Sequence, residues 1–190
     1  MTATFDPGLV DRAVRSEPEA TAALLEQLRP GVVRYCRAKL GRVGGAYTTA
    51  DDVAQEVCLA LLRALPRYRD QGRPFTAFVY TIAAHKVADA QRAAVRGPGP
   101  TPTFPDRPDA APGPEQQAVS TDLARRLSVL LAQLPEQQRE IVLLRVAAGL
   151  SAEETGVIVG LSAAVVRVYQ SRALARLRTL AGDSLGEVAA

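Results

Sequence analysis

The sequence predicts an all-α protein in which two small helical domains are joined by a flexible, proline-rich linker. Apolar residues recur at helical spacing over most of the 190 residues, no convincing strand pattern occurs, and residues 97–114 contain seven of the 13 prolines. We expect an N-terminal tail at residues 1–16, a first domain at 17–96, a linker at 97–117, a second domain at 118–181 and a C-terminal tail at 182–190.

Composition restricts the class of protein. Hydrophobic residues make up 47% of the chain, aromatic residues 5%, and there is no Trp, so we expect a core built from Ala, Leu and Val. No apolar run approaches the roughly 18 residues of a membrane span, and the N-terminus lacks a signal-peptide pattern. These features predict a cytoplasmic protein without membrane insertion. The net charge of +3 is too small an excess to indicate nucleic-acid binding by itself.

The residue types needed for catalysis or metal binding are scarce. Cys36 and Cys58 each lie in an apolar helical pattern, which indicates buried thiols rather than a disulfide. One histidine and two distant cysteines do not make a zinc site. No nucleophile–base pair or phosphate-binding loop is present either. We therefore expect no cofactor, no metal and no enzymatic activity.

The first domain begins with helical patterns separated by turns. Residues 17–40 are amphipathic, and Pro30–Gly31 is predicted to divide them into two helical pieces with a break or a kink at the proline. Thr49 is expected to cap the next helix, with carboxylates in its first turn, where the helix dipole favours them. One face of this helix is apolar. The opposite face carries Asp52, Gln55, Glu56 and Leu59.

Residues 65–96 combine a basic loop with a long helix. The loop at 67–73 contains three arginines, and Pro74 stands where a first helical residue tolerates proline. The helix has an apolar stripe of Phe75, Phe78, Val79, Ile82 and Val87, and His85, Asp89, Arg92 and Arg96 recur on another face. A basic loop leading into such a helix is consistent with a nucleic-acid surface.

The second domain is predicted to be a series of short helices. Residues 118–133 and 136–148 form the first two, with Ile141, Leu144 and Val146 buried and Gly149 as the stop. A capping box at 151–154 begins a short helix that ends near residue 159. After a glycine turn, Ser162 caps a last helix that runs to about residue 180.

A helix, a tight glycine turn and a basic helix together indicate a helix-turn-helix that reads duplex DNA. Leu161, Val165 or Val166, Leu174 and Leu177 are expected to pack inward. Arginine binds guanine through two hydrogen bonds or holds a phosphate. The outward residues predicted to contact DNA are Arg167, Val168, Ser171 and Arg172.

Three segments resemble consecutive parts of bacterial sigma-70 factors. Residues 51–68, DDVAQEVCLALLRALPRY, resemble the polymerase-binding helix of that family. Residues 73–92, RPFTAFVYTIAAHKVADAQR, resemble its promoter-melting segment. Residues 134–178 resemble the fourth domain, which reads the minus-thirty-five element, including the phrase L-P-x-x-x-R-E. The order of the segments indicates the extracytoplasmic-function (ECF, group IV) class. The segment LPRYRDQGRPF resembles the actinobacterial SigD-like branch of this class.

The resemblance implies a protein that binds core RNA polymerase, places it on a promoter and stabilises strand opening. Contacts with the polymerase β′ clamp would come from Asp52, Gln55, Glu56 and Leu59, and the β flap would be a further contact. The loop at 67–73 would hold a base flipped from the stack. The implied minus-ten DNA contacts are Tyr68, Arg69, Arg73, His85, Lys86, Asp89 and Arg92. The implied partners also include an anti-sigma factor, and the free protein is expected to be a monomer.

Two other functions share these features. A stand-alone helix-turn-helix regulator would bind a palindromic duplex as a dimer without polymerase. A sigma mimic would sequester an anti-sigma factor without binding DNA, but the basic residues of the last helix argue against it. The chain also departs from the usual Ala-Arg-Asn before the minus-ten helix, because Ala83, Ala84 and His85 stand there. The promoter sequence is therefore not predicted.

Overall fold

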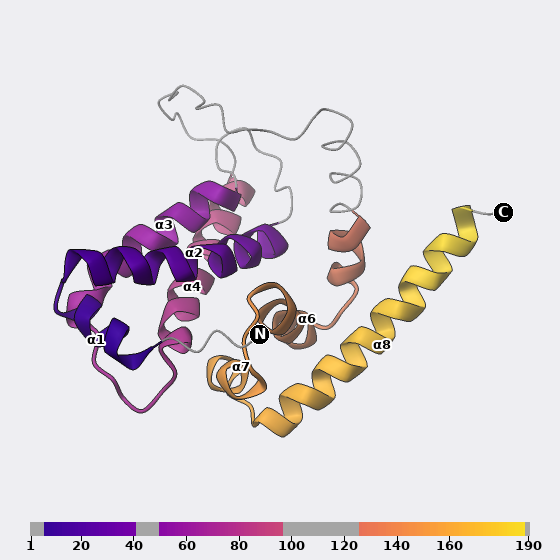
Figure 1. Ribbon diagram of the computed structural model, residues 1–190. Coiled ribbons are helices and arrows are strands. Elements are labelled where there is room, and N and C mark those ends of the chain that lie inside the picture. Colours follow the sequence, from indigo (N-terminus) through magenta and orange to yellow (C-terminus); the bar gives the residue numbers. More distant parts are fainter. Residues whose placement is uncertain (1–5, 41–49, 97–125, 189–190) are drawn as a thin grey trace.

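The computed structural model describes residues 6–40, 50–96 and 126–188, and the side chains of all of these except 96 and 183–188. Every regular element within the described ranges is a helix, which confirms the all-α prediction there. The helices form two groups, one before and one after residues 97–125 (Figure 1). The cap expected at Thr49 and the linker expected to be disordered lie outside the described residues.

The N-terminal residues, predicted to be a tail, contain a helix of their own. Helix α1 spans Pro7–Val14, and the side chain of Asp6 caps it by accepting a hydrogen bond from the Gly8 amide at 3.1 Å. Val10 and Ala13 are buried in the core. These two apolar residues, three apart on one face, give the helix its reason to pack.

Helix α2 spans Pro18–Leu40 without interruption, so the predicted break at Pro30–Gly31 is wrong. Proline at this place removes one backbone hydrogen bond. Pro30 and Glu26 are both exposed, so the carbonyl left without its partner belongs to the exposed side of the helix. Leu28 and Val32, on either side, are buried in the same core. Packing of a continuous apolar face therefore outweighs the local cost of the proline.

The first group is completed by helix α3 (Ala50–Ala64), the short 3-10 helix η1 (Leu65–Arg67) and helix α4 (Phe75–Arg96). Helix α3 packs on α2 and α4 through its predicted apolar face. The largest buried side chains of α3 and α4 are Val53, Val57, Leu61, Val79 and Val87. Tyr80 is 3% exposed, so it also belongs to the core.

The second group contains a helix at residues 126–132, helix α6 (Glu136–Val142) and a π-helical turn η2 (Leu143–Ala147). Ile141 and Leu144 are buried as predicted, but Val146 is 61% exposed, so its predicted burial is wrong. The π turn explains this, because its amides bond five residues back, as Ala148 does to the Leu143 carbonyl. The wider turn rotates Val146 away from the core.

Helix α7 (Ala152–Val159) and helix α8 (Ala163–Val188) complete the predicted helix-turn-helix. The capping box is confirmed, since the Glu154 amide bonds Ser151 Oγ and the Ser151 amide bonds Glu154 Oε2. Gly149 and Gly160 have φ angles of 80° and 71°, the left-handed conformation that favours glycine. The two predicted stops are therefore confirmed.

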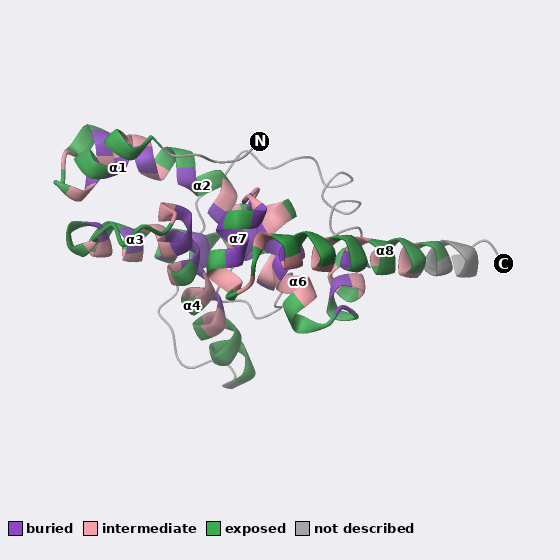
Figure 2. Ribbon diagram, turned by 90° about the horizontal axis from the view of Figure 1, so that it is seen from below, coloured by how far each residue is buried: buried purple, intermediate pink, exposed green. Residues whose placement is uncertain are grey.

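One buried cluster extends through both groups of helices. Helix α7 packs against α4, and the η2 turn packs against α2. Figure 2 shows buried residues concentrated where α2, α4 and α7 meet, while α8 projects away with much of its surface exposed. Among the described residues, no single helix is long and apolar enough to cross a membrane. One bent pair, Ala152–Val159 with Ala163–Gly182, passes that test on length and composition only.

Candidate nucleic-acid interface

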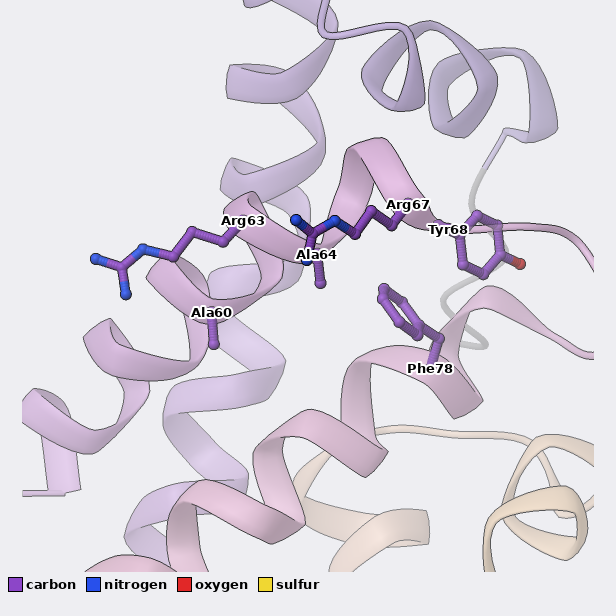
Figure 3. Close-up of a pocket in the computed structure, with 6 residues that line it drawn as sticks. All are labelled: Ala60, Arg63, Ala64, Arg67, Tyr68 and Phe78. Carbon is purple, nitrogen blue, oxygen red and sulfur yellow. The ribbon is translucent and has the colours of Figure 1, made fainter.

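A groove of about 400 Å³ opens where the end of α3 meets the first turn of α4. Its lining consists of Ala60, Arg63, Ala64, Arg67, Tyr68 and Phe78. Figure 3 shows Ala60 and Ala64 pointing from α3 towards α4, with the ring of Phe78 between α4 and Tyr68. An apolar floor beside guanidinium groups suits a planar base attached to a phosphate. The sequence indicated Tyr68 and the basic loop, but not Ala60, Arg63 or Ala64.

Three aromatic rings support one side of the groove. The ring of Tyr68 lies 5.2 Å from Phe75 at an interplanar angle of 88° and 4.9 Å from Phe78 at 49°. One edge-to-face and one tilted contact stabilise the orientation of the Tyr68 ring. Burial, followed by the nearby carboxylates of Asp70 and Asp11, raises the pKa of Tyr68, so its hydroxyl stays protonated. Tyr68 therefore offers a fixed ring face and a hydrogen-bond donor.

The loop between η1 and α4 is shaped by its own side chains. The Gly72 amide donates to Asp70 Oδ1 at 2.8 Å, and Gly72 has a φ of 73°. This turn reverses the chain before α4 begins. Arg69 folds back to donate to the Tyr68 carbonyl at 3.0 Å, whereas Arg73 is exposed. Arg69 and Arg73, the loop arginines predicted to contact DNA, are both exposed.

The polar face predicted for α4 is present and leads away from the groove. His85, Asp89 and Arg92 are exposed, and Arg92 binds Asp89 at 2.5 Å. Lys86 lies 3.4 Å from Glu56 of α3. A residue predicted to contact DNA therefore forms an ion pair with one predicted to contact polymerase. The two predicted surfaces meet at this pair.

The face of α3 predicted to bind polymerase is accessible along its length. Asp52, Gln55 and Glu56 are exposed, and Leu59 is 45% exposed. Leu62 beside it is 43% exposed, which adds apolar area that the sequence did not single out. Polar acceptors around a small apolar patch resemble the composition of transient protein interfaces.

The helix-turn-helix depends on a close approach at its turn. A Cβ atom at Gly156 would lie 2.5 Å from the Leu161 carbonyl oxygen, so glycine alone allows α7 and the start of α8 to meet there. Val166 and Ala173 are fully buried beneath α8, and Leu174 and Leu177 are half-buried. The inward face predicted for this helix is therefore correct, with Val166 rather than Val165 in the core.

The four residues predicted to read duplex DNA are all exposed on α8: Arg167, Val168, Ser171 and Arg172. Arg167 is held by Glu153 of α7 at 2.5 Å. A hydrogen bond from its own backbone amide, together with the Arg167 guanidinium, lowers the pKa of Glu153, so the carboxylate stays ionised. The pair orients the Arg167 side chain. Arg167 lies near the beginning of α8, the part of the second helix that contacts base edges in helix-turn-helix proteins.

Arg145 makes a contact with α8 that the sequence did not indicate. Arg145 of the η2 turn donates to Gln170 Oε1 at 2.9 Å and also binds the Leu150 carbonyl. One guanidinium thereby joins η2, the following loop and α8. The only signal in the sequence was a charged residue inside an apolar run.

The cysteines and carboxylates do not form a reactive site in the described part of the chain. Cys36 is buried, Cys58 is half-buried, and both are free thiols, as the sequence suggested. Burial raises the pKa of Cys36 to about 12, which keeps it from ionising. No cluster of three or more His, Cys, Asp or Glu residues suited to a metal ion occurs among the described residues.

Two family models match the chain. The first, described as Sigma-70 region 2, matches residues 24–97, which include α3, the groove and α4. The second, described as Sigma-70, region 4, matches residues 124–177, which include the helix-turn-helix.

Several characterised proteins are similar over almost the whole chain. ShbA of Streptomyces griseus, an ECF RNA polymerase sigma factor, is 54% identical over 178 residues, covering 91% of this chain and 93% of that protein. SigD of Mycobacterium tuberculosis, of the same class, is 55% identical over 179 residues, covering 92% and 84%. The solved structure of CnrH with the cytosolic domain of CnrY shares the fold, with a TM-score of 0.67 at 24% identity over 92% of this chain and 96% of that one.

Proposed function

This chain belongs to the sigma-70 family as an ECF RNA polymerase sigma factor, and we propose that it binds core polymerase through one face of α3 and promoter DNA through two other surfaces. It acts by binding rather than by catalysis. The observation that carries this assignment is the exposed polar face of α3, which ends at the groove beside the basic loop.

The polymerase surface consists of Asp52, Gln55, Glu56 and Leu59, with Leu62 added by its exposure. Carboxylate and amide oxygens accept hydrogen bonds from basic side chains on the β′ clamp. The exposed leucines supply the apolar area that a stable contact needs. The β flap is the second polymerase contact, made by the second group of helices.

The minus-ten surface begins at the groove. We propose that a base flipped from the DNA stack enters it and packs against Tyr68 and Phe78, while Arg63 and Arg67 hold the adjacent phosphates. Unstacking a base costs a few kcal/mol, and stacking on an aromatic ring returns about 1–3 kcal/mol. The groove would therefore offset much of the cost of unstacking that one base. Further contacts to the single strand come from Arg69, Arg73, His85, Lys86, Asp89 and Arg92.

The minus-thirty-five surface is the exposed face of α8. Arg167 and Arg172 bind base edges or phosphates in the major groove, and Val168 and Ser171 make the closer contacts between them. Glu153 is a positioning residue, because it fixes the direction of the Arg167 guanidinium.

An anti-sigma factor is the regulatory partner that we propose, and the free chain is a monomer that acts in the cytoplasm, where polymerase and DNA are found. The fold shared with CnrH, which has been solved with the cytosolic domain of CnrY, supports a protein partner of this kind.

Substitution of Gln55 tests the assignment of the polymerase surface. Gln55→Ala should weaken binding to core polymerase while leaving the affinity of the free chain for DNA unchanged. Gln27→Ala is the matched control, because Gln27 is also an exposed helical glutamine but lies on α2. Core binding is measured by titrating labelled chain with core enzyme. An equal effect of the two substitutions would remove this face of α3 from the assignment.

A further inference from the structure

Helix α1 lies beside the short turn that carries two residues of the groove. It packs against α2 and against η1. The turn η1 ends at Arg67 and is followed directly by Tyr68, and both of these residues line the groove. In Figure 3 the pale indigo ribbon of the N-terminal helices passes above η1, and Phe78 of α4 lies below it. The segment matched to Sigma-70 region 2 begins at residue 24, so α1 precedes it.

The η1 turn cannot fix its own orientation. It has three residues, and a single backbone hydrogen bond closes it, from the Tyr68 amide to the Leu65 carbonyl at 3.0 Å. Hydrogen bonds of the 3-10 type have poorer geometry than those of an α-helix, so a turn of this length is weakly held by its own backbone. Its orientation therefore depends on the elements that pack against it.

The apolar face of α1 supplies part of this packing. Val10 and Ala13 are 7% and 1% exposed, and Leu9 is half-buried against the same cluster of core residues. Leu65 of η1 belongs to that cluster, and Tyr68 packs against it. A helix of eight residues is not stable in water by itself. Helix α1 is therefore ordered by this packing, and η1 is supported by it in return.

A polar side chain of α1 also lies near Tyr68. The carboxylate of Asp11 is close enough for its charge to raise the pKa of Tyr68, after the larger effects of burial and of the Asp70 charge. Asp70 belongs to the loop that follows η1, whereas Asp11 comes from α1. The tyrosine is thus held by α4 through its ring contacts and lies within electrostatic reach of α1.

The connection between α1 and α2 holds α1 in one position. Ser16 has a φ of 63°, a left-handed conformation that is uncommon for a residue other than glycine. The Ser16 amide donates to the Ala13 carbonyl at 2.9 Å, and the Glu17 carboxylate lies 3.3 Å from both Arg12 and Arg15. A backbone conformation of this cost persists only where the surrounding contacts determine it. Helix α1 is therefore folded back onto α2 by a defined turn.

We propose that α1 is a positioning element for the minus-ten groove, because its packing on η1 holds Arg67 and Tyr68 where a flipped base can enter. This inference rests on the function proposed for the groove, since α1 itself lines no part of it. A loosely held η1 would have to be ordered each time a base enters, and that ordering weakens binding. Packing by α1 orders the turn in advance.

Shortening one buried side chain of α1 tests the proposal. Val10→Ala removes two carbon atoms from the packing beneath α1 and should lower the affinity of the holoenzyme for a single-stranded minus-ten oligonucleotide several-fold. Val32→Ala is the matched control, because Val32 is a valine of α2 that is 1% exposed. It should destabilise the chain at least as much while leaving the affinity for the oligonucleotide unchanged. An equal loss of affinity in the two variants, or no loss for Val10→Ala, would overturn the proposal.

A double-mutant cycle separates positioning of the groove from a general structural effect. Ala60→Leu fills the groove, and in that background Val10→Ala should cause little further loss of affinity for the oligonucleotide. Two substitutions that act through one site are coupled in this way, whereas independent effects add. Losses that simply add would place the action of α1 outside the groove and contradict the inference.

Hydrogen exchange of the free full-length chain tests the contact without DNA. The Tyr68 amide, which bonds the Leu65 carbonyl, should exchange several-fold faster in Val10→Ala than in wild type, because a local opening of η1 is enough to expose it. Val32→Ala should leave its rate unchanged. Equal acceleration by the two substitutions would assign the effect to global stability and remove the positioning role.

The two measurements distinguish failure of this inference from failure of the proposed function. A wild-type holoenzyme that does not bind the oligonucleotide would refute the function of the groove, while faster exchange at Tyr68 in Val10→Ala alone would still show that α1 orders η1. Binding of the oligonucleotide that is insensitive to Val10→Ala would refute the positioning role of α1 and leave the groove as the binding site.

Discussion

At the scale of single residues, arginine has three different roles in this protein. Arg167 is oriented by Glu153, and Arg145 supports α8 from behind through Gln170. Arg172 is exposed on the recognition face, where it can reach a base edge. Periodicity identified the exposed arginines correctly, but it could not distinguish Arg145, because its partners lie in other elements.

Arg172→Ala should weaken binding to the minus-thirty-five duplex by about 1–3 kcal/mol and relax the preference at one base pair, as expected for loss of a base contact. Arg178→Ala, farther along α8, should weaken binding evenly across sequences if it contacts phosphate alone. The measurement is a titration of each protein variant with the minus-thirty-five duplex and with every single-base variant of that duplex. A uniform loss for Arg172→Ala would make it a phosphate contact instead.

Filling the groove should impair capture of single-stranded promoter DNA. Ala60→Leu keeps a good helix former on α3 but places three more carbon atoms in the groove. Affinity of the holoenzyme for a single-stranded minus-ten oligonucleotide should fall by an amount comparable to one stacked base, about 1–3 kcal/mol.

The control for this substitution is Ala22→Leu, at an exposed position of α2 away from the groove. It should leave the affinity for the oligonucleotide unchanged. Equal affinities for wild type and Ala60→Leu would show that no base occupies the groove.

At the scale of elements, the sequence predicted where most helices lie but not how two of them deviate. The capping box, the glycine stops and the apolar faces are local signals, and the described residues contain them except at Val146. The continuity of α2 through Pro30 and the π turn that exposes Val146 depend on packing against other helices. Contacts of that kind have no signature in a local pattern.

The helix-turn-helix should be sensitive to one methyl group. Gly156→Ala forces a Cβ against the Leu161 carbonyl and should lower the free energy of unfolding by about 1–3 kcal/mol. Gly182→Ala meets nothing within 4 Å and should instead raise stability by up to about 1 kcal/mol. Urea unfolding of both variants checks this. If both substitutions lowered the free energy of unfolding equally, the close approach at the turn would not be the cause.

The ion pair between α2 and α3 should make the free energy of unfolding depend on pH in the acidic range. Arg37 binds Asp51 through two hydrogen bonds of 2.7 and 2.6 Å, and these lower the pKa of Asp51. A carboxylate with a lowered pKa contributes stability above its ordinary pKa and loses it as the pH falls through the lowered value. Because both side chains are more than half exposed, the contribution at neutral pH stays below about 1 kcal/mol.

Asp51→Asn should therefore be less stable than wild type near neutral pH, and the difference should vanish in strong acid. Glu26→Gln, at an exposed position of α2, serves as the control and should show no such change of the stability difference with pH. Unfolding measured as a function of pH decides this. A difference that persists below the lowered pKa would assign the effect to something other than the ion pair.

At the scale of the whole molecule, the two surfaces proposed for DNA and the one proposed for polymerase lie on a single packed core. The family resemblance implied the residues of these surfaces, and all of them are exposed or half-buried in the structure. Their mutual arrangement was not predictable, because Tyr35 and Glu140 are 105 residues apart and nothing local relates them. The contact between Tyr35 and Glu140 is a property of the folded chain alone.

Potassium permanganate footprinting of a promoter tests the central claim most directly. With core polymerase and this chain together, thymines in the minus-ten element should become reactive, and the minus-thirty-five element should be protected from nuclease. Neither the chain nor the core enzyme alone should produce the unpaired thymines. Protection of a palindromic duplex by the chain without polymerase, with no unpaired bases in the complete mixture, would contradict the account.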